Sequence, residues 1–345
     1  MYTNAVYYPN WRVYRNQPPS SLNFGMISHV FYAFARIDDD GSICLSDSWA
    51  DDEMEVDGVK GCLRSFAALK KIPSNTHVKV ILSVGGGGAG SDKFPLMAQD
   101  PTTRTRFADS ARAMVDKYEL DGIDIDWEHP SDAIQGTNFL SLLQCLRAAL
   151  PAPRYLLTSA LPAGEWALQY IPLAPAAQLL DLINLMAYDF FGPWSPIAGH
   201  QAALYAPTPD TPCANTAIEY LVKCGVPCSK ILLGIPVYGR SFLGAQAAGQ
   251  AYAGSAGDEG TFEFRDLPRN DAVEQVDLQL GAAWCVGTNE AGGWISYDVP
   301  ETVRVKAAYA KERGLAGLFY WTVTGDSVAE RSLVMAGYRE LHSVE

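Results

Sequence analysis

Residues 121–127 read DGIDIDW, and together with the next residue, Glu128, they decide how the chain folds. Acidic and apolar residues alternate here with the period of two that is typical of a β-strand. The acids are Asp124, Asp126 and Glu128, and the apolar residues are Ile123, Ile125 and Trp127. In a half-exposed antiparallel strand these acids would face water. In a barrel of parallel strands both faces are covered, so the acids would point into the interior.

Strand-like and helix-like segments alternate along the whole chain. Short β-branched or aromatic runs occur at residues 4–8, 28–35, 78–84, 121–127, 155–161, 182–188, 230–238 and 316–321. Longer segments between them have helical spacing, for example 102–119, 136–150 and 299–314, and the last of these opens with Pro300 and closes on Gly314. Eight repeats of strand and helix predict an α/β fold, a (β/α)8 TIM barrel.

One interval between strands is longer than the others. Residues 242–294 are rich in Gly and Ala and contain the strand-like pieces GTFEFRDL, AAWCVG and GWISYD. We expect a small α+β insertion domain at 242–294, between strand 7 and helix 7 of the barrel. The catalytic barrel would then comprise residues 1–241 and 295–345.

The composition excludes several classes of partner and site. The 345 residues are 48% hydrophobic and 19% charged, with a net charge of -13, so a nucleic acid or an anionic membrane surface is not expected to bind. No apolar run approaches the roughly 18 residues of a membrane span. The seven cysteines are scattered, and the C-x3-C pair Cys224 and Cys228 has no second pair or nearby histidine, which argues against zinc. We expect a monomer that needs no metal and no cofactor.

Inward-facing acids would be costly in a barrel unless they serve a function. Burying an ionised carboxylate costs several kcal/mol, and barrel sites lie at the C-terminal ends of the strands. Asp124, Asp126 and Glu128 are about 6.6 Å apart from step to step, at about 3.3 Å per residue. At least one of them should therefore hold a proton near neutral pH. Glu128, the outermost, is a candidate general acid, whereas Asp121 has the opposite parity and is interpreted as structural.

Other strand ends supply polar and aromatic side chains. They are Tyr188, Asp189, Tyr238, Arg240 and Trp321. Each has a structural alternative, because aromatic residues at strand ends often only pack and an arginine can form a surface ion pair. Together at one rim, aromatic faces beside carboxylates indicate sugar binding, since sugar C–H faces stack on rings while acids bind hydroxyls.

A glycine-rich run offers a rival hypothesis. Gly85, Gly87 and Gly90 follow a strand and formally satisfy G-x-G-x-x-G, the dinucleotide fingerprint. The fingerprint normally lies in the first βα unit, however, and the acids on the next strand here would repel a pyrophosphate. We expect a tight turn that brings the backbone close to the site. A nucleotide-dependent oxidoreductase is kept as the alternative.

These motifs resemble a known family. The stretch DGIDIDWE at 121–128 resembles, at every position, the DxxDxDxE signature of family 18 glycoside hydrolases, the chitinases. SVGG at 83–86 is similar to the family's SxGG motif, MAYD at 186–189 to its strand-six motif, and GIPVYGRSF at 234–242 and Trp321 match in order. The resemblance runs from about Tyr7 to the last helix and is strongest to fungal members.

The resemblance implies the reaction. It would be hydrolysis of β-1,4 bonds between N-acetylglucosamine units of chitin or chito-oligosaccharides, with retention, in which the 2-acetamido group replaces the protein nucleophile. Glu128 would protonate the leaving oxygen. Asp126 would orient the acetamido N–H, with Asp124 sharing its proton, and Tyr188 would hold the acetamido oxygen.

The resemblance also implies the substrate-binding residues. Asp189, Tyr238 and Arg240 would bind and distort the sugar, Trp321 would form its floor, and Tyr7 and Trp11 would line the non-reducing side. The remaining predicted binding residues are Phe34, Gly86, Gly87, Met186 and Trp194.

One position departs from the family pattern. Many relatives carry Trp directly after SxGG, where this chain has Gly87, so stacking on the leaving-group side should be weaker, with Trp194 partly compensating. The insertion is also short, and both features favour a shallow cleft and endo-type cleavage.

Two alternatives share the fold. A non-catalytic chitin lectin typically lacks the acid at the position of Glu128, and an endo-N-acetylglucosaminidase acting on N-glycans tends to differ at the strand-six Tyr-Asp. An extracellular location follows from an insoluble substrate. A cytoplasmic location is the alternative, because MYTNAVYYPNW has no basic start and no apolar h-region.

Overall fold

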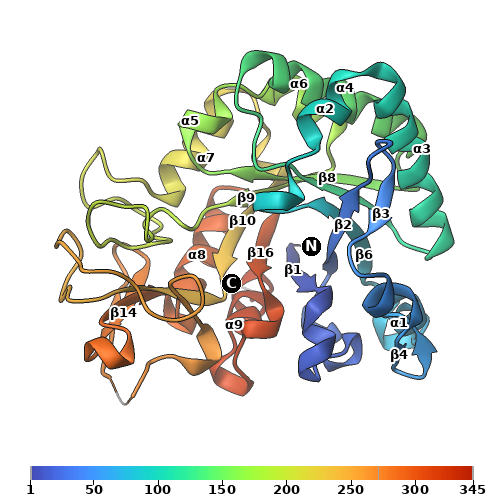
Figure 1. Ribbon diagram of the computed structural model, residues 1–345. Helices are drawn as coiled ribbons and strands as arrows, with labels where there is room; N and C mark the ends of the chain where they lie inside the picture. The colour runs from blue at the N-terminus through green and yellow to red at the C-terminus, as the bar shows by residue number, and fades with distance from the viewer. Residues whose placement is uncertain (1, 271, 344–345) are drawn as a thin grey trace. The chain divides into compact units, whose positions relative to one another are not determined.

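The computed structural model describes residues 2–270 and 272–343. Its main sheet has nine strands in the order β1-β16-β10-β9-β8-β7-β6-β2-β3, and β1 also pairs with β2 in parallel. The extra pairing closes the sheet, so the predicted (β/α)8 barrel is confirmed (Figure 1). The barrel strands are β1 (Thr3–Pro9), β2 (His29–Ile37), β6 (Lys79–Gly85), β7 (Gly122–Asp126), β8 (Leu156–Pro162), β9 (Leu182–Met186), β10 (Ile231–Pro236) and β16 (Gly317–Trp321).

Two short pairings lie beside the barrel strands. The strand β3 (Ile43–Leu45) is antiparallel to β2, and β4 (Glu55–Val56) forms a two-stranded hairpin with β5 (Val59–Lys60). Both belong to the connection between β2 and the first helix.

The helices begin and end at the signals that the sequence contains. The Asp100 side chain caps α3 by accepting a hydrogen bond from the Thr102 N–H, and Asp132 caps α4 through the Gln135 N–H. Pro300 is the first residue of α8, as predicted. The helices are α1 (Cys62–Lys70), α2 (Phe94–Gln99), α3 (Pro101–Lys117), α4 (Ala133–Ala149), α5 (Glu165–Leu168), α6 (Leu173–Leu179), α7 (Ala214–Lys223), α8 (Pro300–Glu312) and α9 (Leu333–Leu341). No described helix has the length and apolar character needed to cross a bilayer.

A second sheet forms between the seventh barrel strand and α8, where the insertion was expected. It is antiparallel, with the strand order β12-β11-β15-β14-β13. Its strands are β11 (Tyr238–Phe242), β12 (Thr261–Glu263), β13 (Glu274–Asp277), β14 (Ala282–Val286) and β15 (Trp294–Tyr297). The sheet begins at Tyr238, before the expected start of the insertion at residue 242. The exact domain boundaries therefore stay a prediction.

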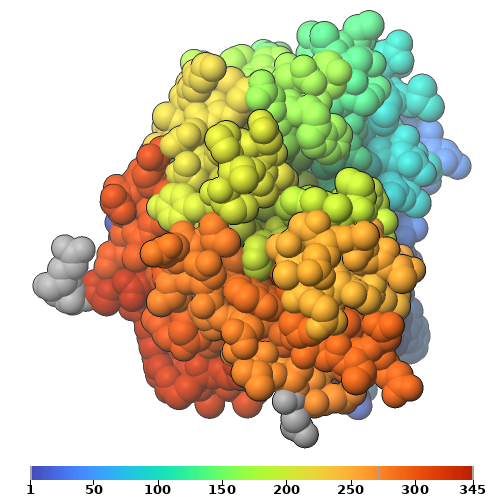
Figure 2. Space-filling model, turned by 90° about the vertical axis from the view of Figure 1, so that its left-hand side faces the viewer, coloured from blue at the N-terminus to red at the C-terminus, as the bar shows by residue number. Residues whose placement is uncertain are grey.

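Packing divides the chain into two compact units, which are described separately. Residues 5–185 and 221–232 form the first, which we call the acid-strand unit because it contains β7. The other described residues form a second unit, which we call the insertion unit because it contains the antiparallel sheet. It is larger than the predicted insertion domain 242–294. Within the insertion unit, the Ala198 N–H donates to the Gln250 carbonyl at 2.9 Å, and Figure 2 shows the yellow-green segment around residue 198 beside the orange segment that follows β11.

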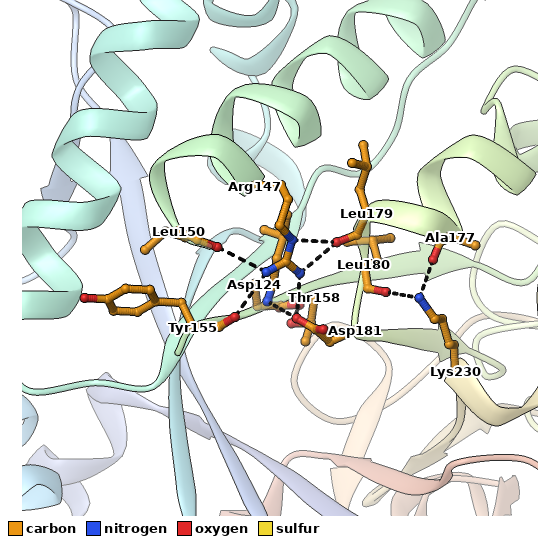
Figure 3. A network of polar contacts seen from close by, with 11 residues as sticks. Asp124, Arg147, Leu150, Tyr155, Thr158, Ala177, Leu179, Leu180, Asp181 and Lys230 are labelled. Atoms are coloured by element: carbon orange, nitrogen blue, oxygen red, sulfur yellow. Dashed lines mark hydrogen bonds and ion pairs between the residues drawn. The ribbon is translucent and has the colours of Figure 1, made fainter. Parts of the chain in front are cut away.

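A polar brace organises the acid-strand unit at the starts of β8 and β9 (Figure 3). Arg147 of α4 contacts the Asp181 carboxylate at 2.6 Å, and Asp181 also accepts the Leu157 N–H at 2.8 Å. The Arg147 guanidinium also donates to the backbone carbonyls of Leu150, Tyr155 and Leu179. These contacts set the positions of β8 and β9, which carry two polar residues of the candidate site.

Candidate active site

Asp124 lies at the centre of a buried polar network on β7. Its Oδ2 accepts hydrogen bonds from the hydroxyls of Tyr7 at 2.8 Å and Ser83 at 2.7 Å. Its Oδ1 accepts from the Thr158 hydroxyl at 2.7 Å and from the Asn184 amide at 3.4 Å, and Figure 3 shows Asp124 beside Thr158. The four donors come from β1, β6, β8 and β9. Asp124 therefore points into the barrel, as the strand pattern predicted.

The apolar residues of the same strand face the opposite way. The Trp127 ring stacks on Phe94 of α2, with centroids 5.3 Å apart, and meets the edge of Phe139 of α4 at 6.2 Å. Trp127 is 2% exposed. This packing against two helices holds β7 in the register that turns the acids inward.

Asp121 has a different environment from the other acids. It precedes β7, forms ion pairs with Lys70 and Lys79, and accepts the Val80 N–H at 2.8 Å. These contacts join the start of β7 to the start of β6, which agrees with the interpretation of Asp121 as structural.

Asp124 and Asp126 differ in how well their charged forms are stabilised. Burial raises the pKa of Asp124, but the hydroxyls of Thr158, Ser83 and Tyr7 oppose this rise by donating to its charged form. Burial, followed by the charges of Glu128 and Asp124, raises the pKa of Asp126 well above its usual range. The Oδ1 atom of Asp126 has no hydrogen-bond partner among the residues that the structure describes. Asp126 therefore binds a proton more readily than Asp124, whose charged form has more hydrogen-bond donors.

A glycine-rich turn is hydrogen-bonded to the end of β7, next to Glu128. The Glu128 N–H donates to Ser91 Oγ at 2.8 Å, and the Ser91 hydroxyl donates to the Gly86 carbonyl at 2.9 Å. Gly86 in turn donates its N–H to the Asp126 carbonyl at 2.9 Å. Its φ of 88° is left-handed, and a Cβ there would come within 2.7 Å of the Phe34 ring, so only glycine fits. This is the tight turn that the glycine run predicted.

The space beside the Glu128 carboxylate is open at Gly87. This glycine is exposed, and a Cβ built on it would lie 3.7 Å from Glu128 Oε1, an ordinary contact distance. Its φ of -62° suits any residue. A larger side chain at this position would therefore flank the acid directly.

Tyr7 is buried, although a residue that lines the non-reducing side of the site was expected to be exposed. It is 1% exposed, and its hydroxyl bonds to Asp124 and accepts from the Asn184 amide at 2.8 Å. We assign Tyr7 to the network beneath the acids because a buried ring leaves little surface for a sugar.

Two exposed tryptophans lie after the first barrel strands. Trp11 follows β1, is 45% exposed, and has its ring 6.5 Å from that of the half-buried Phe34 on β2. Trp49 follows β3 and is 59% exposed. Trp49 was not predicted from the sequence, although an aromatic residue between two strands can indicate a sugar-binding position.

A second polar cluster lies within the insertion unit. One carboxylate oxygen of Asp189 accepts from the Tyr238 hydroxyl at 2.7 Å and from Arg240 Nε at 2.6 Å. We call these three residues the sugar triangle, after the sugar-binding role that their motifs predict. Burial, with the nearby Asp189 charge, raises the pKa of Tyr238 well above its usual range, so its hydroxyl remains a donor. The Arg240 guanidinium also lies over the Trp194 ring, 4.6 Å from its centroid, and Trp194 is 61% exposed.

The other predicted residues of this unit lie at strand ends. The Tyr188 ring meets the rings of Tyr238 and Phe319 edge-on, with centroids 6.3 and 6.1 Å away. Met186 ends β9 and Trp321 ends β16, and both are half-buried. Their roles toward a substrate stay predictions.

Most of the residues that support the acids were not predicted from the sequence. They are Ser91, Thr158 and Asn184, whereas Ser83 was noted only as part of the SVGG motif. Asn184 is the single polar residue of the strand LINLM, and Thr158 with Ser159 interrupts the otherwise apolar strand LLTSAL. Such an interruption of a buried strand is the same signal that identified the acids.

All seven cysteines are free thiols. Across residues 2–270 and 272–343, no group of three or more His, Cys, Asp or Glu side chains is placed to hold a metal ion.

Comparisons with known proteins agree with the motifs. The family model described as glycosyl hydrolases family 18 matches residues 3–326. The chain is 36% identical to "Endochitinase 1" of Metarhizium robertsii, over 96% of this chain and 84% of that protein. It superposes on a GH18 chitinase from Cycas revoluta, solved in complex with (GlcNAc)3, with a TM-score of 0.86, 28% identity and 99% coverage of both chains.

A further likeness concerns binding proteins. A chitinase-like agglutinin from Robinia pseudoacacia superposes with a TM-score of 0.85 and 27% identity, covering 98% of this chain and 99% of that one. The fold by itself therefore does not separate hydrolases from binding proteins.

Proposed function

The chain belongs to family 18 of the glycosyl hydrolases and is a chitinase, and we propose that it cleaves internal β-1,4 bonds of chitin and chito-oligosaccharides with retention. One observation carries this proposal: Asp124 and Asp126 are buried on β7 directly before the half-buried Glu128, and burial raises the pKa of both. That arrangement can supply a proton to a leaving group and a negative charge to a developing cation.

Glu128 acts twice in the proposed reaction. As general acid it gives its proton to the glycosidic oxygen, and the C1–O bond breaks while the 2-acetamido carbonyl oxygen of the same sugar bonds to C1. The product of this step is an oxazolinium ion. Glu128, now ionised, then takes a proton from water as the water oxygen attacks C1, so the configuration at C1 is retained.

The proton shared by Asp124 and Asp126 controls the charge during this cycle. In the free enzyme the proton lies on Asp126, whose pKa burial raises. When the acetamido N–H bonds to Asp126, the proton passes to Asp124, and ionised Asp126 stabilises the positive oxazolinium ring. The four donors around Asp124 keep it poised to exchange this proton.

The remaining residues bind the sugars. Tyr188 holds the acetamido oxygen, the sugar triangle binds and distorts the ring, and Trp321 forms its floor. Trp11, Phe34 and Trp49 provide aromatic faces for further units, and exposed rings of this kind fit a shallow cleft that admits the middle of a chain. Met186, Gly86, Gly87 and Trp194 complete the proposed contacts.

Substitution of the general acid tests the proposal. Glu128→Gln keeps the shape but removes the proton, so turnover of defined chito-oligosaccharides should fall by at least about 10²–10⁴-fold while binding persists. Glu119→Gln is the matched control, because Glu119 pairs with Lys71 and both side chains are more than half exposed. A Glu128→Gln protein that keeps most of its turnover would overturn the assigned role.

A non-catalytic binding protein is the second candidate, because the agglutinin shares this fold. It predicts tight binding of the oligomers and no release of shorter products by the native chain. Retention of Glu128 favours the enzyme.

A further inference from the structure

Gln201 is a buried residue of the insertion unit that contacts three separate segments. It is 0% exposed, and its carbonyl accepts the Phe190 N–H at 2.9 Å. Its side-chain amide donates to the Tyr238 carbonyl at 2.8 Å and to the Ser296 carbonyl at 3.3 Å. Its own N–H donates to Ser296 Oγ at 3.0 Å. The side chain of Gln201 thus fixes the backbone at Tyr238 and Ser296, and its main chain fixes the backbone at Phe190.

Each of these places adjoins one member of the sugar triangle. Phe190 follows Asp189, Tyr238 is itself a member, and Ser296 lies opposite Arg240 in the pairing of β11 with β15. Gln201 contacts none of the three functional groups directly. Its side chain holds the backbone of Tyr238 and of Ser296, the partner of Arg240, and its main chain holds the residue that follows Asp189.

The backbone of Asp189 needs such support. Its φ is 60°, in the left-handed region that non-glycine residues adopt only at a cost of about 1–3 kcal/mol. The Phe190 N–H that follows is held by the Gln201 carbonyl. Because the Asp189 carboxylate must meet both Tyr238 and Arg240, a change of this backbone would break both hydrogen bonds.

Gln201 itself is anchored independently of the triangle. The next carbonyl, of Ala202, accepts from Lys306 of α8 at 2.6 Å. Lys306 and Asp298 form an ion pair at 2.6 Å in which both side chains are 1% exposed. A buried ion pair whose hydrogen bonds are satisfied is rigid. The segment that contains Gln201 is therefore held in place by Lys306 of α8.

We propose that Gln201 is a positioning residue for the sugar triangle and thereby sets how firmly the enzyme holds the sugar that is cleaved. This inference rests on the proposed function. The competing explanation is that Gln201 only stabilises the insertion unit.

The main test removes the side-chain hydrogen bonds and keeps the volume. Gln201→Met should lower kcat/KM on a defined chito-oligosaccharide by about tenfold, within the range of couplings between residues of one network. In the Tyr238→Phe background the same change should cost less, about threefold, because the Tyr238–Asp189 hydrogen bond is already absent and only the Arg240–Asp189 one remains. Unchanged kcat/KM, or a loss that multiplies in full with that of Tyr238→Phe, overturns the inference.

A matched control separates positioning from stability. Ser241→Ala also removes buried hydrogen bonds in β11, to the Gly292 carbonyl and from the Ala256 N–H, without touching the triangle. Both variants should lower Tm, but only Gln201→Met should lower kcat/KM at temperatures where both are folded. Equal kinetic losses in the two variants overturn the inference.

Two further measurements cover the remaining outcomes. If Gln201→Met does not fold, Ser296→Ala removes one of its hydrogen-bond partners and should lower kcat/KM about threefold, and no loss would contradict the proposal. If the native chain is inactive on these oligomers, the proposed function fails, and crystal structures decide the inference. The Tyr238 hydroxyl should separate from Asp189 in Gln201→Met and remain in place in Ser241→Ala.

Discussion

Tyr7→Phe isolates the contribution of one hydroxyl to the charge of Asp124. The substitution removes the 2.8 Å hydrogen bond from Tyr7 to Asp124 and leaves the buried ring in place. Three donors then remain, the hydroxyls of Ser83 and Thr158 and the amide of Asn184. The charged form of Asp124 loses stabilisation, so its pKa must rise.

The size of the rise follows from the contacts. A hydrogen bond to a charged group contributes about 1.5–3 kcal/mol, and one pKa unit corresponds to about 1.36 kcal/mol, so the rise is about 1–2 units. Tyr7 ranks behind Thr158 and Ser83 among the groups that lower the pKa of Asp124. Asn184 donates to Tyr7 in the native chain, and in the variant it is free to donate more strongly to Asp124. Both facts favour a rise of about 1 unit in the pKa of Asp124.

The assay is the pH dependence of kcat/KM on a chito-oligosaccharide of defined length. The acidic limb reports the second protonation of the Asp124 and Asp126 pair, which blocks ionisation of Asp126. A higher pKa brings this protonation to higher pH, so the acidic limb should move up by about 1 unit.

Tyr8→Phe is the matched control for this prediction. Tyr8 is the next residue of β1, is equally buried, and loses a 2.7 Å hydrogen bond to the Gln17 carbonyl, away from the acids. Both variants should lose similar stability. An acidic limb that stays in place in Tyr7→Phe, or moves equally in Tyr8→Phe, would refute the reasoning.

Three further changes test other parts of the structure. Arg147→Met removes the ion pair with Asp181, which keeps only the Leu157 N–H, and the donor of three carbonyls, and should lower the free energy of unfolding by about 2–3 kcal/mol, measured by urea denaturation; a loss below about 1 kcal/mol would contradict the role of the brace. Burial lowers the pKa of His200 to about 4, so the unfolded chain takes up this proton first and stability falls as the pH drops from about 6.5 to 4; His200→Leu should flatten Tm across that window, and an unchanged slope argues against it. Gly87→Trp should tighten binding on the leaving-group side by about tenfold, from about 1.5 kcal/mol of apolar contact; calorimetry with the Glu128→Gln protein checks this, and unchanged affinity would contradict an open flank beside the acid.

The sequence by itself determined the fold class and the strand that carries the acids. Alternation is a local property: apolar and acidic residues at every second position must face opposite sides of a strand, and eight strand and helix repeats leave few ways to close a sheet. The helix signals Pro300 and Gly314 act within one turn of the chain, which is why they can be read in the sequence.

The tertiary structure alone decided how the acids are held. Asp124 receives its donors from Tyr7, Ser83, Thr158 and Asn184, which lie on four different strands, and no local pattern states that these side chains meet. The same holds for Gln201, whose partners come from three separate segments. Protonation depends on burial and on the distances between charges, and these exist only once the sheet has closed.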